Sequence, residues 1–268
     1  MMKRAVRRIG LAAGLMLAGA SAAQAQMLQW QDKGFLNIGY GSKSGAPTDV
    51  SENTTFSLYD EQGKIAVTQT IKNSRGSFDI SGGARIWQNL GAGIGYSSIH
   101  TTGTGSVTAT VPHPLLYDSP RTATVSVIGL EHKVSAVHLF ALWMFPVTDK
   151  LDVAISGGPT FFTLSQDMVG SASPTEVGPP YTSINLSSVG NVASKKHKSG
   201  VNIGADLTYK LAGLFGASQT AKKLDKMLGV GAYIRWSGAS ANVTTAGGSA
   251  VTLDLGGLQI GFGARIRF

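Results

Sequence analysis

The sequence ends in QIGFGARIRF, residues 259–268, where apolar residues alternate strictly with polar residues or glycine. Successive side chains of a β-strand point to opposite faces, so a period of two predicts a strand. One face of this strand is apolar up to its last residue, and the other carries glycine and arginine. The apolar set is Ile260, Phe262, Ala264, Ile266 and Phe268. A strand of this kind packs either against a protein core or against lipid, and the rest of the chain must decide between them.

The first 25 residues read as a secretory signal peptide. They begin with a basic segment, continue with an apolar run over residues 9–20 and end in Ala23-Gln24-Ala25, a small-residue cleavage pattern. The apolar run is too short for a membrane-spanning helix. We therefore expect cleavage after Ala25, export across the inner membrane, and a single folded domain over residues 26–268.

Composition and charge favour an exported β protein over a nucleic-acid-binding one. Glycine contributes 35 of 268 residues, only 14% of residues are charged, and cysteine is absent. The formal net charge of +8 includes four basic residues of the signal peptide, which leaves 19 basic against 15 acidic residues, a net charge of +4. This mild balance does not indicate a nucleic-acid partner.

Alternation of the same kind recurs along the chain. In GFLNIGYG, residues 34–41, Leu36, Ile38 and Tyr40 share one face while asparagine and glycine share the other. A strand needs about 9–11 residues to cross a bilayer at a tilt. Eight stretches show this alternation and are each roughly long enough to cross, at about residues 34–41, 77–87, 90–96, 133–146, 151–156, 199–211, 228–236 and from 251 to the end.

The connections between these strands differ in length. Those at 87–89 and 147–149 are tight, whereas 42–76, 101–124 and 166–198 are long and rich in Ser, Thr, Pro and Gly, as in outer-membrane barrels with long external loops. The segment 212–226 is long where a tight inner turn is expected, and Ser218 there can cap a short helix. Residues 54–72 read as two strands around DEQGK. They form either a hairpin above the membrane or another pair of spans, so ten strands is an alternative to eight.

Backbone hydrogen bonding favours closure of this sheet. In hydrocarbon each unsatisfied backbone group costs several kcal/mol, so a sheet that spans a membrane must have no free edge. The sequence therefore predicts an all-β fold, a closed antiparallel up-and-down transmembrane β-barrel of eight strands. Aromatic residues at the two membrane interfaces are typical of such barrels, and the candidates are Tyr40, Trp87, Trp143, Trp236 and Phe268.

Several stretches resemble known outer-membrane barrels. They are FSLYDE (56–61), FDISGGARIWQNLGAGIGYSS (78–98), VPHPLLYDSPRT (111–122) and FALWMFPVTDKLDVAISGGPTFF (140–162). They are similar to those of bacterial outer-membrane β-barrel domain proteins, related in architecture to small OmpA-like and opacity-type barrels. The terminal set Phe262, Ala264, Ile266 and Phe268 resembles the C-terminal signature by which such proteins are recognised for assembly. The resemblance implies a Gram-negative outer-membrane location and contact with the barrel assembly machinery.

Charged residues at inward positions bear on what the barrel does. An eight-stranded barrel has an interior that side chains just fill, whereas open channels need about 16–18 strands. Inward residues of both positive and negative charge are present, which predicts a plug of ion pairs. The alternative is that some of these pairs exchange partners and gate a narrow, porin-like channel for small solutes. The inward charges are Asp79, Arg85, Asp152, Asp206, Lys210, Arg235, Arg265 and Arg267.

A lipid A-modifying enzyme is the third alternative, and the histidines disfavour it. Acyl transfer needs a nucleophile with a base in hydrogen-bond reach. None of the histidines lies in the His-x-Ser arrangement associated with barrel deacylases, and their spacing predicts no metal site or cofactor. We therefore expect no enzyme. The histidines are His100, His113, His132, His138 and His197.

The basic stretch SKKHKS, residues 194–199, lies where a long outer loop meets the sixth strand. Lysine is a point charge suited to phosphate, so Lys195, Lys196 and Lys198 are candidates for contact with lipopolysaccharide; the alternative is a solvated loop base. The sequence thus predicts a non-enzymatic barrel with a plugged interior and long extracellular loops, which acts in membrane structure or surface interaction. Its expected partners are outer-membrane lipid and lipopolysaccharide, together with an extracellular ligand.

Overall fold

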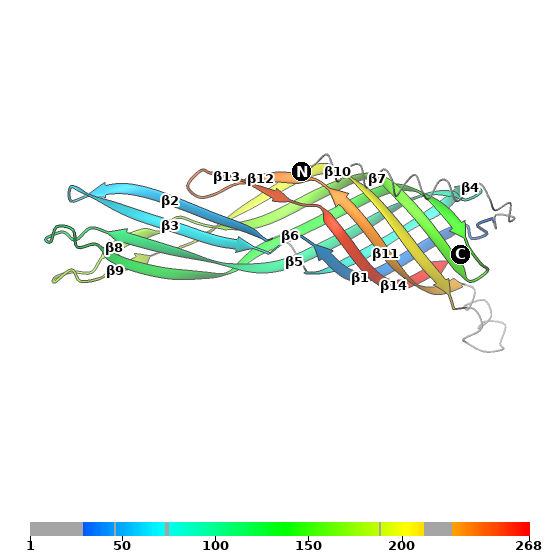
Figure 1. The fold of residues 1–268 in the computed structure, drawn as a ribbon, viewed down its shortest axis with the longest axis horizontal. Coiled ribbons are helices and arrows are strands. Elements are labelled where there is room, and N and C mark those ends of the chain that lie inside the picture. The colour runs from blue at the N-terminus through cyan, green and yellow to red at the C-terminus, as the bar shows by residue number, and fades with distance from the viewer. Residues whose placement is uncertain (1–28, 46, 73–74, 188, 212–226) are drawn as a thin grey trace, which may run out of the picture.

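The chain folds into one elongated, all-β structure (Figure 1). The computed structural model describes residues 29–45, 47–72, 75–187, 189–211 and 227–268. Within these ranges, no helix has both the length and the apolar character needed to cross a membrane. The expected signal peptide, residues 1–25, and the expected helical segment, residues 212–226, lie outside the described residues.

Eight strands form a closed antiparallel ring. Each pairs with the next, and the last pairs with the first, with Phe35 opposite Arg267 and Tyr40 opposite Phe262. The terminal alternation therefore builds the strand that closes the barrel, and the predicted fold class is confirmed. In ring order the strands are β1 (Gly34–Ser44), β4 (Arg75–Trp87), β5 (Leu90–Val111), β6 (Arg121–Pro146), β7 (Leu151–Val169), β10 (Asn191–Lys210), β11 (Leu228–Gly238) and β14 (Gly257–Arg267).

The two strands predicted around DEQGK form a hairpin outside this ring. They are β2 (Thr48–Leu58) and β3 (Glu61–Ile71), joined by a turn in which Tyr59 and Asp60 have φ of 54° and 59°. Two positive φ values in a row are typical of the tight turns that match strand twist. Of the ring strands, β3 pairs with β5 alone, and only with its outer part, so the alternative of ten membrane strands is wrong.

Most of two segments expected to be loops is continuous strand. Most of residues 101–124 extends β5 and β6, and β6 alone runs for 26 residues. The two ends of residues 166–198 extend β7 and β10, and a separate short hairpin lies between them. Their Ser and Thr content suggested loops, but the residues alternate. Val107 and Ala109 are fully buried, whereas Thr108 and Thr110 lie on the other face, where both hydrogen-bond to threonines of β6. Apolar side chains face inward here, the reverse of the barrel.

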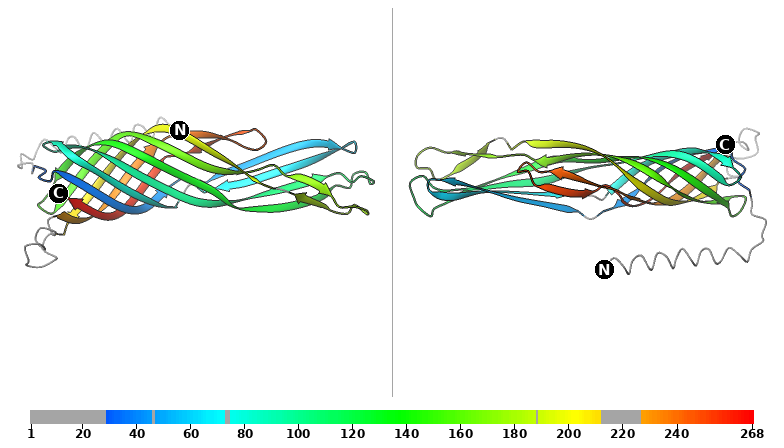
Figure 2. Two further views of the ribbon diagram at one scale, coloured as in Figure 1. Left: turned by 180° about the vertical axis from the view of Figure 1, so that it is seen from behind. Right: turned by 90° about the horizontal axis from the view of Figure 1, so that it is seen from above.

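The strands β5, β6, β7 and β10 continue past the end of the barrel (Figure 2). We call the part of the molecule beyond the barrel the extension. Two short hairpins complete it: β8 (Ser173–Glu176) with β9 (Ile184–Ser187), and β12 (Ser240–Thr244) with β13 (Ala250–Asp254). Its largest core cluster joins β2 and β3 to β6, β7 and the β12–β13 hairpin. The cluster contains Val50, Ile71, Val134, Ala136, Phe162, Leu164, Met168, Ala241, Val243, Leu253 and Leu255.

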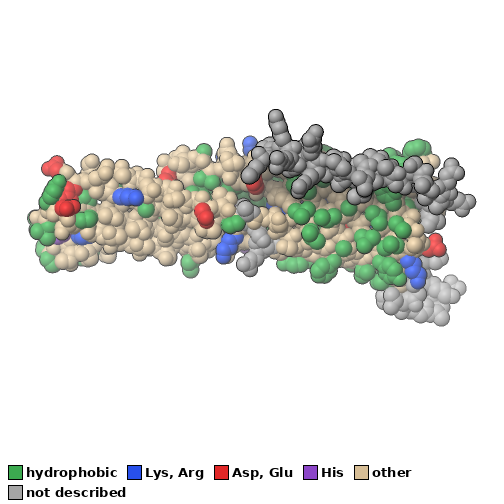
Figure 3. All heavy atoms as spheres, in the orientation of Figure 1, with side chains coloured by type: hydrophobic (Ala, Val, Ile, Leu, Met, Phe, Trp, Pro, Cys, Tyr) green, Lys and Arg blue, Asp and Glu red, His purple; other side chains and the backbone are tan. Residues whose placement is uncertain are grey.

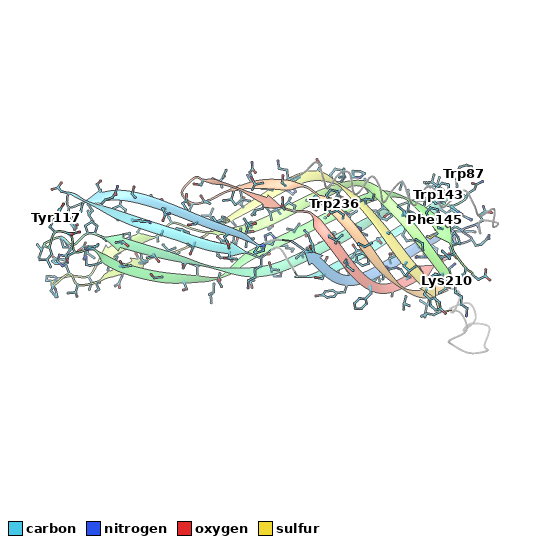
Figure 4. All side chains as sticks on the ribbon, in the orientation of Figure 1. Trp87, Tyr117, Trp143, Phe145, Lys210 and Trp236 are labelled. Atoms are coloured by element: carbon cyan, nitrogen blue, oxygen red, sulfur yellow. The ribbon has the colours of Figure 1, made fainter. Side chains whose placement is uncertain are left out.

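The outer surface of the barrel is an apolar belt. Figure 3 shows hydrophobic side chains gathered over the barrel and mostly polar surface over the extension. Trp87, Trp143 and Phe145 lie at the far end of the barrel, and Trp236 lies near the junction with the extension (Figure 4). The five predicted girdle residues are at least 36% exposed, as residues at a membrane interface should be.

Candidate functional site: the filled interior and the outer tip

The barrel end that carries the short turns, called here the turn end, is closed by an apolar cluster. Its buried members are Trp30, Phe35, Phe140, Leu142 and Met144. Arg85 donates a hydrogen bond to the backbone oxygen of Trp30. The predicted interior charge Arg85 therefore ties the segment before β1 to the barrel wall.

Above this cluster lies a layer of charge pairs between strands distant in sequence. Arg265 donates from Nε to Asp206 Oδ1 at 3.2 Å and from Nη2 to Oδ2 at 2.7 Å, a bidentate contact. Arg235 donates to Asp79 across the lumen. Paired and hydrogen-bonded charges of this kind avoid the large cost of an isolated buried ion.

Arg267 is held by neutral groups. It donates to Asn37 Oδ1 at 2.8 Å and to Thr208 Oγ1 at 2.7 Å, and its guanidinium carbon lies 5.4 Å from the centre of the Phe35 ring. Asn37 and Thr208 are thus interior residues that charge alone does not reveal. Their inward parity on β1 and β10 is the signal that identifies them.

Lys210 lies at the turn end (Figure 4). Its Nζ is 3.1 Å from Asp152 Oδ2 and 3.5 Å from Asp32 Oδ2, so one cation bridges two carboxylates. The structure therefore pairs six of the eight predicted interior charges with one another. Arg85 and Arg267 instead contact neutral groups.

A small cavity remains between the apolar cluster and the charge layer. Its volume is about 40 Å³, room for a few water molecules and no more. Its polar lining includes Asn37, Asp206, Arg235 and Arg267. The interior is therefore packed over most of its length.

Two buried histidines continue the polar filling toward the extension. His138 hydrogen-bonds to Ser97 Oγ and Thr160 Oγ1, each at 2.9 Å. The contact with Ser97 is a serine–histidine pair, and His138 is only 1% exposed. His132 lies higher, above the apolar belt, 2.6 Å from Gln166 Oε1. Burial lowers the pKa of His132.

The predicted surface residues lie on the outside of the molecule. Phe262, Ala264, Ile266 and Phe268 alternate with inward Arg265 and Arg267, so they face the lipid side. Lys195, Lys196 and Lys198 are all exposed in the outer part of β10. Because consecutive residues of a strand point to opposite faces, Lys195 lies on one face, and Lys196 and Lys198 lie on the other.

The tip of the extension, residues 112–120 between β5 and β6, exposes large apolar side chains. Leu115 is 74% exposed and Tyr117 is 85% exposed. Tyr117 lies at the extreme end of the molecule (Figure 4). The sequence alone does not reveal this tip, because three consecutive apolar residues inside a loop, 115–117, show no periodicity.

A buried arginine holds this tip to the neighbouring hairpin. Arg121 donates to Glu176 Oε1 at 2.7 Å and Oε2 at 3.2 Å, and to the backbone oxygens of Pro112 and Tyr181 at 2.6 and 3.1 Å. The hydrogen bonds from Arg121 lower the pKa of the Glu176 carboxyl. The exposed apolar residues are thus presented by an ordered support.

No family model and no curated protein matches this chain. Similar solved structures include the outer membrane protein OprG from Pseudomonas aeruginosa, with 10% identity and a TM-score of 0.45 over 88% of this chain and 96% of that chain. Neisserial surface protein A (NspA) has 12% identity and a TM-score of 0.39 over 88% and 96%. Ail, the attachment invasion locus protein of Yersinia pestis, in complex with the heparin analogue sucrose octasulfate, has 10% identity and a TM-score of 0.34 over 87% and 99%.

Proposed function

We propose that this protein is a closed barrel of the bacterial outer membrane that holds a rigid β-extension at the cell surface, where its tip takes part in surface interaction. One observation carries the proposal. Side chains fill the interior at successive levels along the long axis, while β5 and β6 continue as unbroken strands to an apolar tip (Figure 2). The apolar outer belt with aromatic residues near both edges supports membrane insertion.

The filling has three layers, and each opposes passage of solutes. An apolar cluster closes the turn end, charge pairs and buried histidines fill the middle, and a second apolar core occupies the extension. Rearranging one ion pair would open only the middle layer. A rigid, closed support for the tip therefore explains the geometry better than a channel does.

The narrow channel for small solutes is the second candidate, because the cavity of about 40 Å³ borders Arg235 and Asp206. Single-channel conductance of the chain refolded into a planar bilayer separates the two functions. We expect a folded barrel without discrete current steps. Reproducible steps that change in size in an Asp79→Asn variant would overturn the closed-barrel proposal and assign the charge layer to a gate.

Lipid A modification is the third alternative, and the proposal excludes catalysis. The serine–histidine pair of Ser97 and His138 lies inside the lumen, and an acyl chain held in the surrounding lipid cannot contact it through the intact wall. Mass analysis of lipid A from cells with and without the chain provides the direct test. A change in the number of acyl chains on lipid A in cells that carry the protein would show that it is an enzyme.

A further inference from the structure

The lipid-facing wall of the barrel carries an apolar groove at the junction of β1, β4, β5 and β6. Its volume is about 350 Å³. One outward row of the wall reads Leu36, Gly82, Ile94 and Leu139 across four paired strands. Gly82 has no side chain, so it leaves a gap in an otherwise apolar row. The groove is lined by Leu36, Ile80, Ser81, Gly82, Ile94, Gly95, Tyr96 and Val137.

Polar groups cap this groove on the side of the extension. Tyr96 donates from Oη to Ser135 Oγ at 3.2 Å, and Ser98 Oγ lies 3.5 Å from the same oxygen. Ser98 and Ser135 are direct partners across β5 and β6. The outer face of these two strands therefore changes from apolar to hydroxyl-bearing at one level, as a surface at the edge of the hydrocarbon layer must.

Two residues farther along each strand, the outer face becomes basic. His100 and Lys133 are the next outward partners of β5 and β6, and both are exposed. Lys133 lies about 13 Å along the strand from Val137 at the groove. His100 forms a contact of 3.7 Å with Glu131, but within the described ranges no carboxylate lies within ion-pair distance of Lys133.

A polar recess of about 450 Å³ adjoins this basic level, lined by Lys72, His100, Thr101 and Thr102. On the other side, register places Lys133 and Lys195 on either side of Ser165, and all three share the outer face. Hydroxyl groups suit sugar hydroxyls, and separated lysines suit separated phosphates. Acyl chain, sugar and phosphate thus each have a matching surface in the order in which a glycolipid presents them.

We infer that this wall is a binding site for a phosphorylated glycolipid of the lipid A type, with one acyl chain in the Gly82 groove and a phosphate at Lys133. The inference rests on the proposed outer-membrane placement and adds a ligand to it. Lys133 was not among the lysines that the sequence pattern indicated, because it lies inside a strand and outside the basic run. It faces outward directly above the groove, whereas Lys196 and Lys198 lie on the opposite face of β10.

Native mass spectrometry of the membrane-inserted chain, extracted in mild detergent, tests the site. The probes are bisphosphorylated lipid A, dephosphorylated lipid A and phosphatidylglycerol. We expect the wild-type chain to prefer bisphosphorylated lipid A. Lys133→Gln should lower the affinity for bisphosphorylated lipid A by about fivefold, which is the effect expected from loss of one exposed ion pair. It should leave the affinity for dephosphorylated lipid A nearly unchanged. Lys64→Gln, which removes an exposed lysine of the extension, is the matched control.

Gly82→Val tests the acyl part of the site. A Cβ at Gly82 would lie 3.2 Å from the backbone oxygen of Phe35 and 3.5 Å from Leu36 Cδ1, so valine fits after a small shift and fills the groove. Gly82→Val should lower the affinity for both forms of lipid A. Ala141→Val, on the same lipid-facing surface but outside the groove, should lower neither affinity. Equal binding of all three probes by the wild-type chain, or equal effects of the two valine variants, would overturn the inference.

Failure of the lipid site can be told apart from failure of the proposed function. The heat-induced shift in electrophoretic mobility reports barrel folding in every variant. Conductance steps would refute the closed barrel without changing lipid affinity. Loss of lipid selectivity in a folded, stepless barrel would refute the glycolipid site alone.

Discussion

The Arg265 guanidinium lies almost wholly out of contact with solvent, and Asp206 supplies the opposite charge. Arg265→Ala leaves that carboxylate in the lumen without its bidentate partner. Removing one member of a buried pair typically costs about 3–5 kcal/mol. Because Asp206 keeps some exposure and a hydrogen bond from Thr208, we expect about 3 kcal/mol, measured by urea unfolding of the barrel in detergent micelles.

A double variant separates this charge effect from lost packing. Arg265→Ala with Asp206→Ala removes both charges, so it should be more stable than Arg265→Ala alone. Asp49→Ala, at an exposed position on β2, serves as the control for loss of a carboxylate. Unchanged unfolding of Arg265→Ala would show that the pair does not stabilise the barrel.

At the scale of elements, an ion pair between Arg121 and Glu176 joins the tip to the β8–β9 hairpin. Arg121 lowers the pKa of Glu176, so the pair stabilises the tip above the ordinary carboxyl pKa of about 4.5 and loses that contribution as pH falls through the lowered value. We predict that amides of residues 112–120 lose hydrogen-exchange protection below about pH 4.5, while those of the barrel strands keep theirs.

Glu176→Gln gives the matched comparison for this transition. It should show weak tip protection at every pH, because the amide cannot form the charged contact with Arg121. Substituting Glu131, whose partner His100 is on the barrel side, should leave the tip transition unchanged. Identical pH profiles of Glu176→Gln and the wild-type chain would exclude the pair as the cause.

Periodicity of the elements explains how much the sequence could predict. Alternation in the barrel half is strict, so it predicts the eight strands, the closing role of the terminal strand and the inward parity of Asp79 and Arg265. It does not predict how far β5 and β6 extend, because their Ser and Thr content suggests loops and because β6 contains an extra residue. Gly103 lies opposite Leu130 and Thr104 lies opposite Ile128, which leaves Gly129, at φ 78°, as a bulge.

This bulge changes which residues of β6 face inward. Before it Val125 and Val127 point inward, and after it Leu130 and His132 do. A fixed period of two fails across such a point. The sequence also does not predict which side chains hydrogen-bond across strands, such as His138 with Thr160. These contacts depend on the register between β6 and β7, and alternation alone does not determine that register.

At the scale of the whole molecule, the polarity of the two faces reverses along the long axis. The barrel has an apolar outside and a polar middle, whereas the extension has a polar outside and an apolar core. A membrane can surround only the first half, and water must surround the second. Long strands such as β5 and β6 therefore face lipid in the barrel and water in the extension. The polarity of their outer face reverses near the level of Ser98 and Ser135.

This reversal, together with the position of the short turns, predicts the orientation in the membrane. A short epitope inserted after Tyr117 lies at the tip, and one inserted after Asp149 lies in the tight turn between β6 and β7 at the opposite end. Exposed turns and loop tips tolerate such insertions. Antibody should label intact Gram-negative cells that carry the Tyr117 insertion, and label the Asp149 insertion only after the outer membrane is permeabilised. Heat-shifted mobility of both variants confirms folding. Labelling of the Asp149 insertion on intact cells would place the turn end outside, and the apolar tip could then have no role at the cell surface.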